Sequence, residues 1–148
     1  MNSNCFIDTN VWVYLLQEDA DQHPAVATQF RLFAQNKTQL YLSPDVLEEF
    51  LFIFSKLNRL KGRENIYNAL KEGVNRIRKI PTLEYVSLPT KVDIAYTVID
   101  LMEKYLLSST DAYILLTVLQ NRIPSLMTFD KQLQKAAKAT GKIEVIEL

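Results

Sequence analysis

A six-residue segment near the amino terminus, Cys5-Phe6-Ile7-Asp8-Thr9-Asn10, indicates the class of fold. It begins with an apolar run typical of a buried strand and ends on three residues that favour turns and helix caps. Val11, Tyr14 and Leu15 then recur at helical spacing. The stretch therefore predicts a strand whose carboxyl end leads directly into a helix, with Asp8 at the junction.

The same strand-then-helix unit recurs along the chain. Leu40-Tyr41-Leu42 leads into Ser43-Pro44, a cap followed by proline at the first helical position. Repeated units of this kind predict a parallel sheet covered by helices on both faces, so we expect a three-layer α/β/α sandwich with a central, mainly parallel sheet. The expected strands are 5–7, 40–42, 83–86, 125–129 and 143–146; a helix follows residue 10, and further helices cover 23–33, 45–57, 63–80, 91–107, 111–120 and 131–140.

Length and composition narrow the class of protein. The chain has 148 residues, 48% of them hydrophobic and 23% charged, which predicts a single globular domain over residues 1–148. Cys5 is the only cysteine, so an intrachain disulfide and a cysteine-clustered zinc site are excluded, and His23 is the only histidine, so a site with two imidazole ligands is excluded. No signal-like or membrane-spanning segment stands out, so we expect a cytoplasmic protein with no membrane partner.

The charged residues are balanced in number but segregated along the chain. Residues 1–50 hold two basic and seven acidic residues, whereas residues 56–79 hold eight basic and two acidic residues. The basic segment includes Arg59, Lys61 and Arg63, which could grip a phosphate backbone. An ordinary solvated helix face explains the same pattern equally well.

Four acidic positions, distant in sequence, are expected at one edge of the sheet. Asp8 and Asp130 follow strands directly, while Glu49, or its neighbour Glu48, and Asp111 lie in the first turns of helices that leave the same edge. Ligands bind at the carboxyl ends of strands in open α/β sheets because loops and helix amino termini converge there. Each acid also has a structural explanation, as a turn, a helix cap or a solvated face.

A cluster of carboxylates points to a hard divalent cation. Ionised carboxylates held close together repel one another and raise each other's pKa, so a cation is needed to neutralise them. Mg²⁺ and Mn²⁺ favour oxygen ligands, hold phosphates and lower the pKa of bound water. Phosphodiester hydrolysis is therefore the reaction that the four acids favour.

The four acidic segments together resemble the motifs of PIN domains. The matching segments are Phe6-Ile7-Asp8-Thr9-Asn10, Ser43-Pro44-Asp45-Val46-Leu47-Glu48-Glu49, Ser109-Thr110-Asp111-Ala112 and Thr128-Phe129-Asp130-Lys131. Their order and spacing are most like those of VapC-type toxins of toxin–antitoxin pairs. One departure is Leu106-Leu107-Ser108, which stands where many members have a glycine before the third acid.

The resemblance implies an activity, a cofactor and partners. It implies a Mg²⁺- or Mn²⁺-dependent endoribonuclease that forms a homodimer and is inhibited by a cognate antitoxin. The residues that would bind the metal are Asp8, Glu49, Asp111 and Asp130, and those that would orient them are Thr9, Asn10 and Thr128.

Two other functions are compatible with the residues. A PIN-like module that binds RNA or protein without catalysis would use the acids as caps. An aspartyl-phosphate phosphatase or receiver domain would use Asp8 as its nucleophile, but such phosphatases usually place a second acid two residues later, where this chain has Asn10. Trp12 and Tyr14 are candidates to flank the site or to face a partner subunit.

Overall fold

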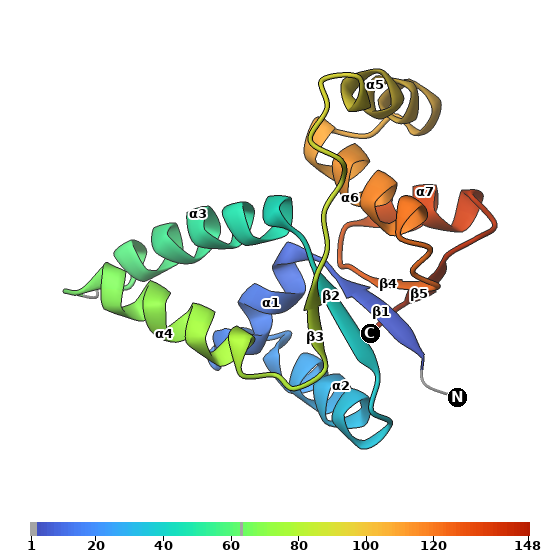
Figure 1. The fold of residues 1–148 in the computed structure, drawn as a ribbon. Helices are drawn as coiled ribbons and strands as arrows, with labels where there is room; N and C mark the ends of the chain where they lie inside the picture. Colours follow the sequence, from blue (N-terminus) through green and yellow to red (C-terminus); the bar gives the residue numbers. More distant parts are fainter. Residues whose placement is uncertain (1–2, 63) are drawn as a thin grey trace.

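A parallel sheet forms the centre of the computed structural model, which describes residues 3–62 and 64–148 (Figure 1). Within these residues five strands form one sheet in the order β3-β2-β1-β4-β5, and every neighbouring pair is parallel. Cys5 of β1 lies opposite Leu40 of β2 on one side and opposite Ser125 of β4 on the other. The strands are β1 (Asn4–Ile7), β2 (Gln39–Leu42), β3 (Leu83–Tyr85), β4 (Ser125–Met127) and β5 (Glu144–Ile146).

Helices cover both faces of this sheet, so the predicted α/β sandwich is confirmed. Figure 1 shows α1 and α2 on one side, α6 and α7 on the other, and α3 and α4 as a helical hairpin that extends away from the sheet. The helices are α1 (Thr9–Leu16), α2 (His23–Gln35), α3 (Pro44–Leu60), α4 (Ile66–Arg78), α5 (Ile94–Tyr105), α6 (Ser109–Gln120) and α7 (Lys131–Ala139).

Strand β1 and helix α6 supply much of the buried core. Phe6 and Ile7 are fully buried, as expected for a strand with a neighbour on each side in a sheet covered on both faces. Helix α6 buries Ile114, Leu115 and Val118, in agreement with its nearly continuous apolar sequence. The core thus fixes β1, which Asp8 follows, and α6, which carries Asp111.

Trp12 is part of this core, so the prediction that it flanks the site or faces a partner is wrong. Its side chain is fully buried, its ring lies edge-on to Phe30, and its indole Nε1–H donates a hydrogen bond to the Ile7 carbonyl at 3.1 Å. Trp12 lies on the buried side of α1 together with Val11 and Val13, as expected for an apolar residue of an amphipathic helix packed against the core.

Helices α4 and α5 are each several residues shorter than their sequence patterns predict. Helix α4 begins at Ile66 rather than at Arg63, because the Asn65 side chain accepts the Asn68 backbone N–H and caps the helix there. Helix α5 covers Ile94–Tyr105 rather than residues 91–107.

Gly73 interrupts the pattern of α4 for a packing reason. A Cβ at this position would lie 3.3 Å from ring atoms of Phe50 and Phe54 and 3.4 Å from a methyl carbon of Leu16. Glycine therefore allows α4 to approach α3 and α1 closely, and the helix continues through it.

The turn before α6 contains the departure from the usual glycine. Leu106 ends α5 in the left-handed conformation, with φ 55°, and its side chain is 80% exposed. Ser108 then caps α6. The chain thus adopts a backbone conformation typical of glycine at a position occupied by leucine.

None of the helices in the described residues is long and apolar enough to cross a membrane.

Candidate metal centre

Asp8 occupies the centre of the candidate site because β1 is the middle strand of the sheet. The residue follows β1 and caps α1, with its Oδ1 accepting the Thr9 backbone N–H at 2.7 Å. Its Oδ2 accepts the Thr128 hydroxyl at 2.6 Å, and its own N–H donates to the Met127 carbonyl. The side chain is fixed in one orientation, with the residue only 4% exposed.

Glu49 approaches Asp8 from the first turns of α3. Ser43 caps that helix by accepting the Val46 N–H, and Pro44 occupies its first position. The Thr9 hydroxyl donates to Glu49 Oε2 at 2.8 Å, which places this carboxylate beside the start of α1. Glu48 is exposed whereas Glu49 is half-buried, so of these two acids Glu49 is the one that faces the cluster.

Asp111 and Asp130 approach from the other side of β1. Asp111 lies in the first turn of α6, where its N–H donates to the Ser108 hydroxyl at 3.2 Å. Asp130 caps α7 by accepting the Leu133 N–H at 2.8 Å, and its own N–H donates to Thr128 Oγ1 at 3.0 Å. Thr128 therefore connects the Asp8 carboxylate to the backbone of Asp130.

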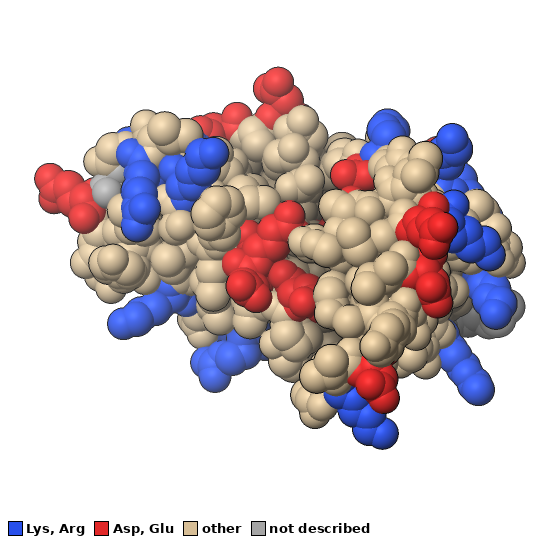
Figure 2. Space-filling model, turned by 90° about the horizontal axis from the view of Figure 1, so that it is seen from above, with Lys and Arg blue, Asp and Glu red and all other residues tan. Residues whose placement is uncertain are grey.

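The four carboxylates are close enough to repel one another. Burial raises the pKa of Asp8 to about 6, hydrogen bonds from Thr128 and Thr9 oppose this rise, and repulsion from Glu49 and Asp111 adds to it. Burial also raises the pKa of Asp111 to about 6, helped by repulsion from Asp130 and from Glu49. An acidic patch in a hollow at the centre of the molecular face is visible in Figure 2.

The carboxylate oxygens are suitable ligands for a hard divalent cation, although they do not converge on a single coordination site. Within residues 3–62 and 64–148, no three Asp, Glu, His or Cys side chains stand ready to hold one common ion. Mg²⁺ usually keeps several waters and is bound through one or two carboxylates. The carboxylates of this site repel one another when no cation is present, and a bound divalent ion would remove that repulsion. The site therefore suits an ion that needs only one or two carboxylate ligands.

The remaining residues with predicted roles lie at different distances from this centre. Asn10 is half-buried in the first turn of α1. Arg59 and Lys61 lie at the far end of α3, and the twelve residues from Glu49 to Lys61 correspond to about 18 Å along a helix. Lys61 pairs with Asp19 at 2.6 Å. Arg63 lies outside the described residues.

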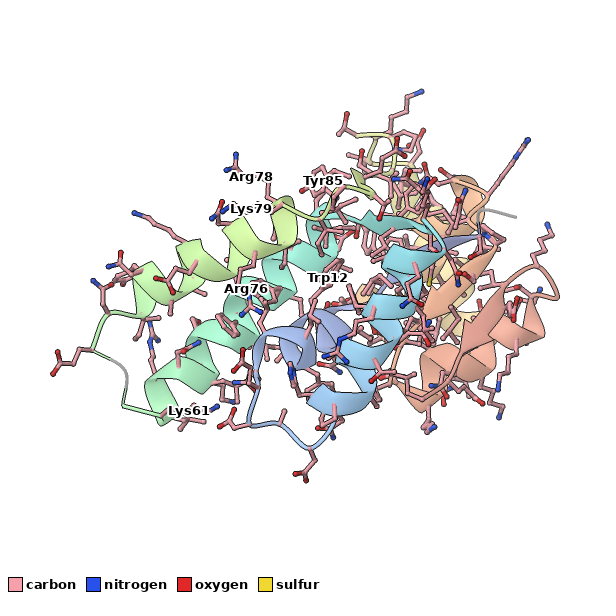
Figure 3. The ribbon with its side chains drawn as sticks, turned by 90° about the horizontal axis from the view of Figure 1, so that it is seen from below. Trp12, Lys61, Arg76, Arg78, Lys79 and Tyr85 are labelled. Carbon is pink, nitrogen blue, oxygen red and sulfur yellow. The ribbon has the colours of Figure 1, made fainter. Side chains whose placement is uncertain are left out.

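The basic side chains of α4 point in two directions. Arg76 lines two cavities that both include Leu16 of α1 in their walls, and its side chain is labelled among the helices in Figure 3. Arg78 and Lys79 point away from the molecule at the end of α4 in the same view. The basic segment is therefore not one continuous face beside the acids.

Gln134 is a residue near the site that the sequence patterns did not single out. It belongs to α7, is 5% exposed, and donates from Nε2 to the Thr128 carbonyl at 2.6 Å. The signal that could have identified it is a polar residue on the buried face of an amphipathic helix, since its neighbours Leu133 and Ala137 are both buried.

The comparisons with known proteins assign the family. The PIN domain model matches residues 5–139, so the chain belongs to the PIN domain family, and the predicted resemblance is confirmed. No curated protein matches the sequence.

Solved structures share the fold at low sequence identity. VapBC2 from Rickettsia felis, bound to a DNA fragment from its promoter, is 16% identical with a TM-score of 0.64, over 97% of this chain and 99% of that one. VapC20 from Mycobacterium tuberculosis, a sarcin–ricin loop cleaving toxin, is 20% identical with a TM-score of 0.64, over 89% and 94%. FitAcB from Neisseria gonorrhoeae is 16% identical with a TM-score of 0.62, over 97% and 96%. Within its family the chain thus resembles VapC-type proteins in fold.

Proposed function

We propose that this protein is a divalent-metal-dependent endoribonuclease that acts as the toxin of a type II toxin–antitoxin pair. The proposal is supported by the hydrogen bonds of Thr9 and Thr128, which link Asp8 with Glu49 and with Asp130 in a PIN-family fold, and by the repulsion of Asp111 from Glu49 and Asp130. The fold likeness to VapC20, which is a sarcin–ricin loop cleaving toxin, supports RNA as the substrate. An RNA substrate also supports action in the cytoplasm.

Each residue of the site has a defined part in this proposal. Asp8, Glu49, Asp111 and Asp130 would hold Mg²⁺, or Mn²⁺, and thereby bind the scissile phosphate. When bound, such an ion would neutralise phosphate charge and lower the pKa of a water molecule, which is the chemistry that phosphodiester hydrolysis requires. The threonines of the site act through the acids, because the Thr9 hydroxyl orients Glu49 and the Thr128 hydroxyl orients Asp8. We assign the same orienting role to Asn10.

The RNA strand requires contacts beyond the acids. We propose Arg59, Lys61 and Arg63 as contacts to its phosphates, because cations supply most of the affinity for nucleic-acid backbones. Arg59 is exposed at the end of α3, about 15 Å along the helix from Glu49, so a strand of several nucleotides would reach both.

A groove between α2 and α4 is our candidate surface for the antitoxin. It encloses about 770 Å³ and has apolar walls that include Leu15, Phe30 and Ile77. Arg31 and Lys37 lie on its rim, so an amphipathic segment with acidic side chains is the complementary occupant. VapBC2 and FitAB are among the proteins of similar fold, which supports a protein partner.

We also propose a homodimer, because apolar side chains remain exposed on α5 and α3. Tyr96 and Ile99 are exposed on α5, and Phe52 is exposed on α3. Light scattering should give twice the chain mass for the wild type, and Tyr96→Lys should shift it toward the monomer. A monomeric wild type at all concentrations would remove this part of the proposal.

Cleavage of total RNA tests the proposed activity. Wild-type protein should cleave RNA with Mg²⁺ or Mn²⁺ and not with EDTA, and Asp8→Asn or Asp111→Asn should abolish cleavage while the protein stays folded. Asp100→Asn is the matched control, because Asp100 is exposed on α5 outside the acidic cluster. Equal cleavage by Asp8→Asn, Asp111→Asn and Asp100→Asn would refute the proposal.

A binding module without catalysis is the second candidate function. It is favoured by the helix-capping bonds of the acids, since Asp8 Oδ1 accepts the Thr9 N–H and Asp130 Oδ1 accepts the Leu133 N–H. This alternative predicts RNA association that is unaffected by EDTA, with no strand cleavage in any metal. The cleavage assay therefore separates the two functions.

A further inference from the structure

A buried amide on α7 holds the turn that connects two of the proposed metal ligands. Gln134 Nε2 donates to the Thr128 carbonyl at 2.6 Å, and both residues are buried. Thr128 in turn donates from its hydroxyl to Asp8 and accepts the Asp130 N–H. Three hydrogen bonds thus run from α7, through one threonine, to two carboxylate-bearing residues.

The geometry of these bonds makes Thr128 the point at which the two acids are aligned. A shift of its backbone would move the hydroxyl away from Asp8 Oδ2, which is only 2.6 Å away. The same shift would move Asp130, because Asp130 donates to that hydroxyl. The Thr128 carbonyl lies beyond the last residue of β4, so Gln134 supplies a donor where the strand ladder has ended.

We propose that Gln134 is a positioning residue for the metal site. By holding Thr128 in place, it keeps Asp8 and Asp130 correctly oriented relative to each other. This inference rests on the proposed function, and it adds a residue outside the four acidic motifs. Partners behind metal ligands commonly change metal affinity by ten- to a hundredfold when they are removed. Thr128 contacts Asp8 directly, whereas Gln134 acts on Asp8 through its hydrogen bond to Thr128.

Mn²⁺ binding by the whole chain tests the inference without relying on activity. Titration followed by electron paramagnetic resonance of free Mn²⁺ gives the dissociation constant for wild type and for Gln134→Met, which keeps the side-chain length and removes the donor. We expect affinity to fall about tenfold or more. Gln134→Leu, which is of similar size and has no donor, should show the same loss and serves if Gln134→Met does not fold.

A stability control separates positioning from general loosening of the fold. Ile123 is buried near the opposite end of β4 from Thr128, so Ile123→Val or Ile123→Ala can be chosen to match the loss in Tm. This control should bind Mn²⁺ within twofold of the wild type. Wild-type affinity in the folded Gln134 variants, or equal loss in the Ile123 control, would overturn the inference alone. A wild type that takes up no Mn²⁺ would overturn the metal-dependent function as well.

Discussion

Asp8 is an ionisable side chain in surroundings that favour its neutral form. Burial raises its pKa from 3.8 to about 6, in spite of the hydrogen bonds from Thr128 and Thr9. An acid whose pKa is raised in the folded state contributes stability below the pKa of the unfolded state, and this contribution is lost as the pH rises through the folded value. The metal-free fold therefore becomes less stable between about pH 4 and pH 6 because of this residue.

Asp8→Asn should remove this pH dependence. The shift corresponds to about 3 kcal/mol, of which about 2 kcal/mol is lost above pH 4.5, so the variant's free energy of unfolding should fall less between pH 4.5 and pH 7.5 than that of the wild type, by about 2 kcal/mol. Urea unfolding in EDTA at the two pH values measures the difference. Asp100→Asn, on the exposed side of α5, should leave the wild-type pH dependence intact. Equal pH dependence in the wild type and Asp8→Asn would contradict the prediction.

Thr9 provides a second prediction at the scale of one side chain. Thr9→Val keeps the shape but removes the hydroxyl that donates to Glu49, so RNA cleavage in Mg²⁺ should fall about tenfold or more. Thr9→Ser retains the donor and should stay near the wild-type rate. Initial cleavage rates, with circular dichroism to verify folding, decide the matter. A valine variant as fast as the serine variant would show that this hydrogen bond has no functional part.

Helix α5 ends at a residue whose conformation suits glycine better than leucine. Leu106 has φ 55° and an exposed side chain, so replacing it loses little packing. Leu106→Gly should raise the free energy of unfolding by about 0.5–1 kcal/mol, because relief of left-handed strain outweighs the added entropy of the unfolded chain. Urea unfolding measures the gain.

Lys104→Gly is the control for Leu106→Gly. Lys104 lies within the last turn of α5, so glycine there should lower the stability by about 1 kcal/mol. Destabilisation by both glycine substitutions would mean that Leu106 contributes through contacts rather than strain.

The helices and strands could be predicted largely because their ends carry local signals. Ser43 and Pro44 start α3, and Asp130 starts α7, as their cap chemistry predicts. The start of α4 was misplaced because Arg63 continues the helical pattern, whereas the capping bond comes from Asn65. Local patterns describe which residues favour a helix, but the first capped turn fixes where it begins.

The candidate site was less accessible to sequence patterns than the fold. Four acids could be placed at one edge from their positions after strands and at helix starts, but their mutual distances depend on packing such as that of α3 against α1 and α6. Gln134 donates to the Thr128 carbonyl, and the position of its polar side chain on the buried face of α7 indicates burial but does not identify this acceptor. Trp12 was misassigned because a large aromatic residue near an acid fits a core position and a binding position equally well.

At the scale of the molecule, the acidic hollow and the groove between α2 and α4 are separate surfaces. Arg31→Glu combined with Lys37→Glu should weaken binding of the antitoxin about tenfold or more and leave RNA cleavage unchanged, because both residues lie on the groove rim. Calorimetry with the proposed antitoxin measures the affinity. Lys135→Glu, an exposed charge reversal on α7, is the control.

Unchanged antitoxin affinity in the Arg31→Glu, Lys37→Glu variant would place the partner elsewhere. A loss of cleavage in that variant would mean instead that the groove belongs to the RNA path. Because none of the four acids lines the groove, each result identifies the surface concerned.

The pairing of β1 with β4 has a consequence for the order of events during synthesis. Asp8 leaves the ribosome before its partner Thr128, which follows 120 residues later. The hydrogen bond between them therefore cannot form until both β1 and the end of β4 have been synthesised. Under the proposed function, a nascent polypeptide that stops short of β4 lacks the aligned metal site.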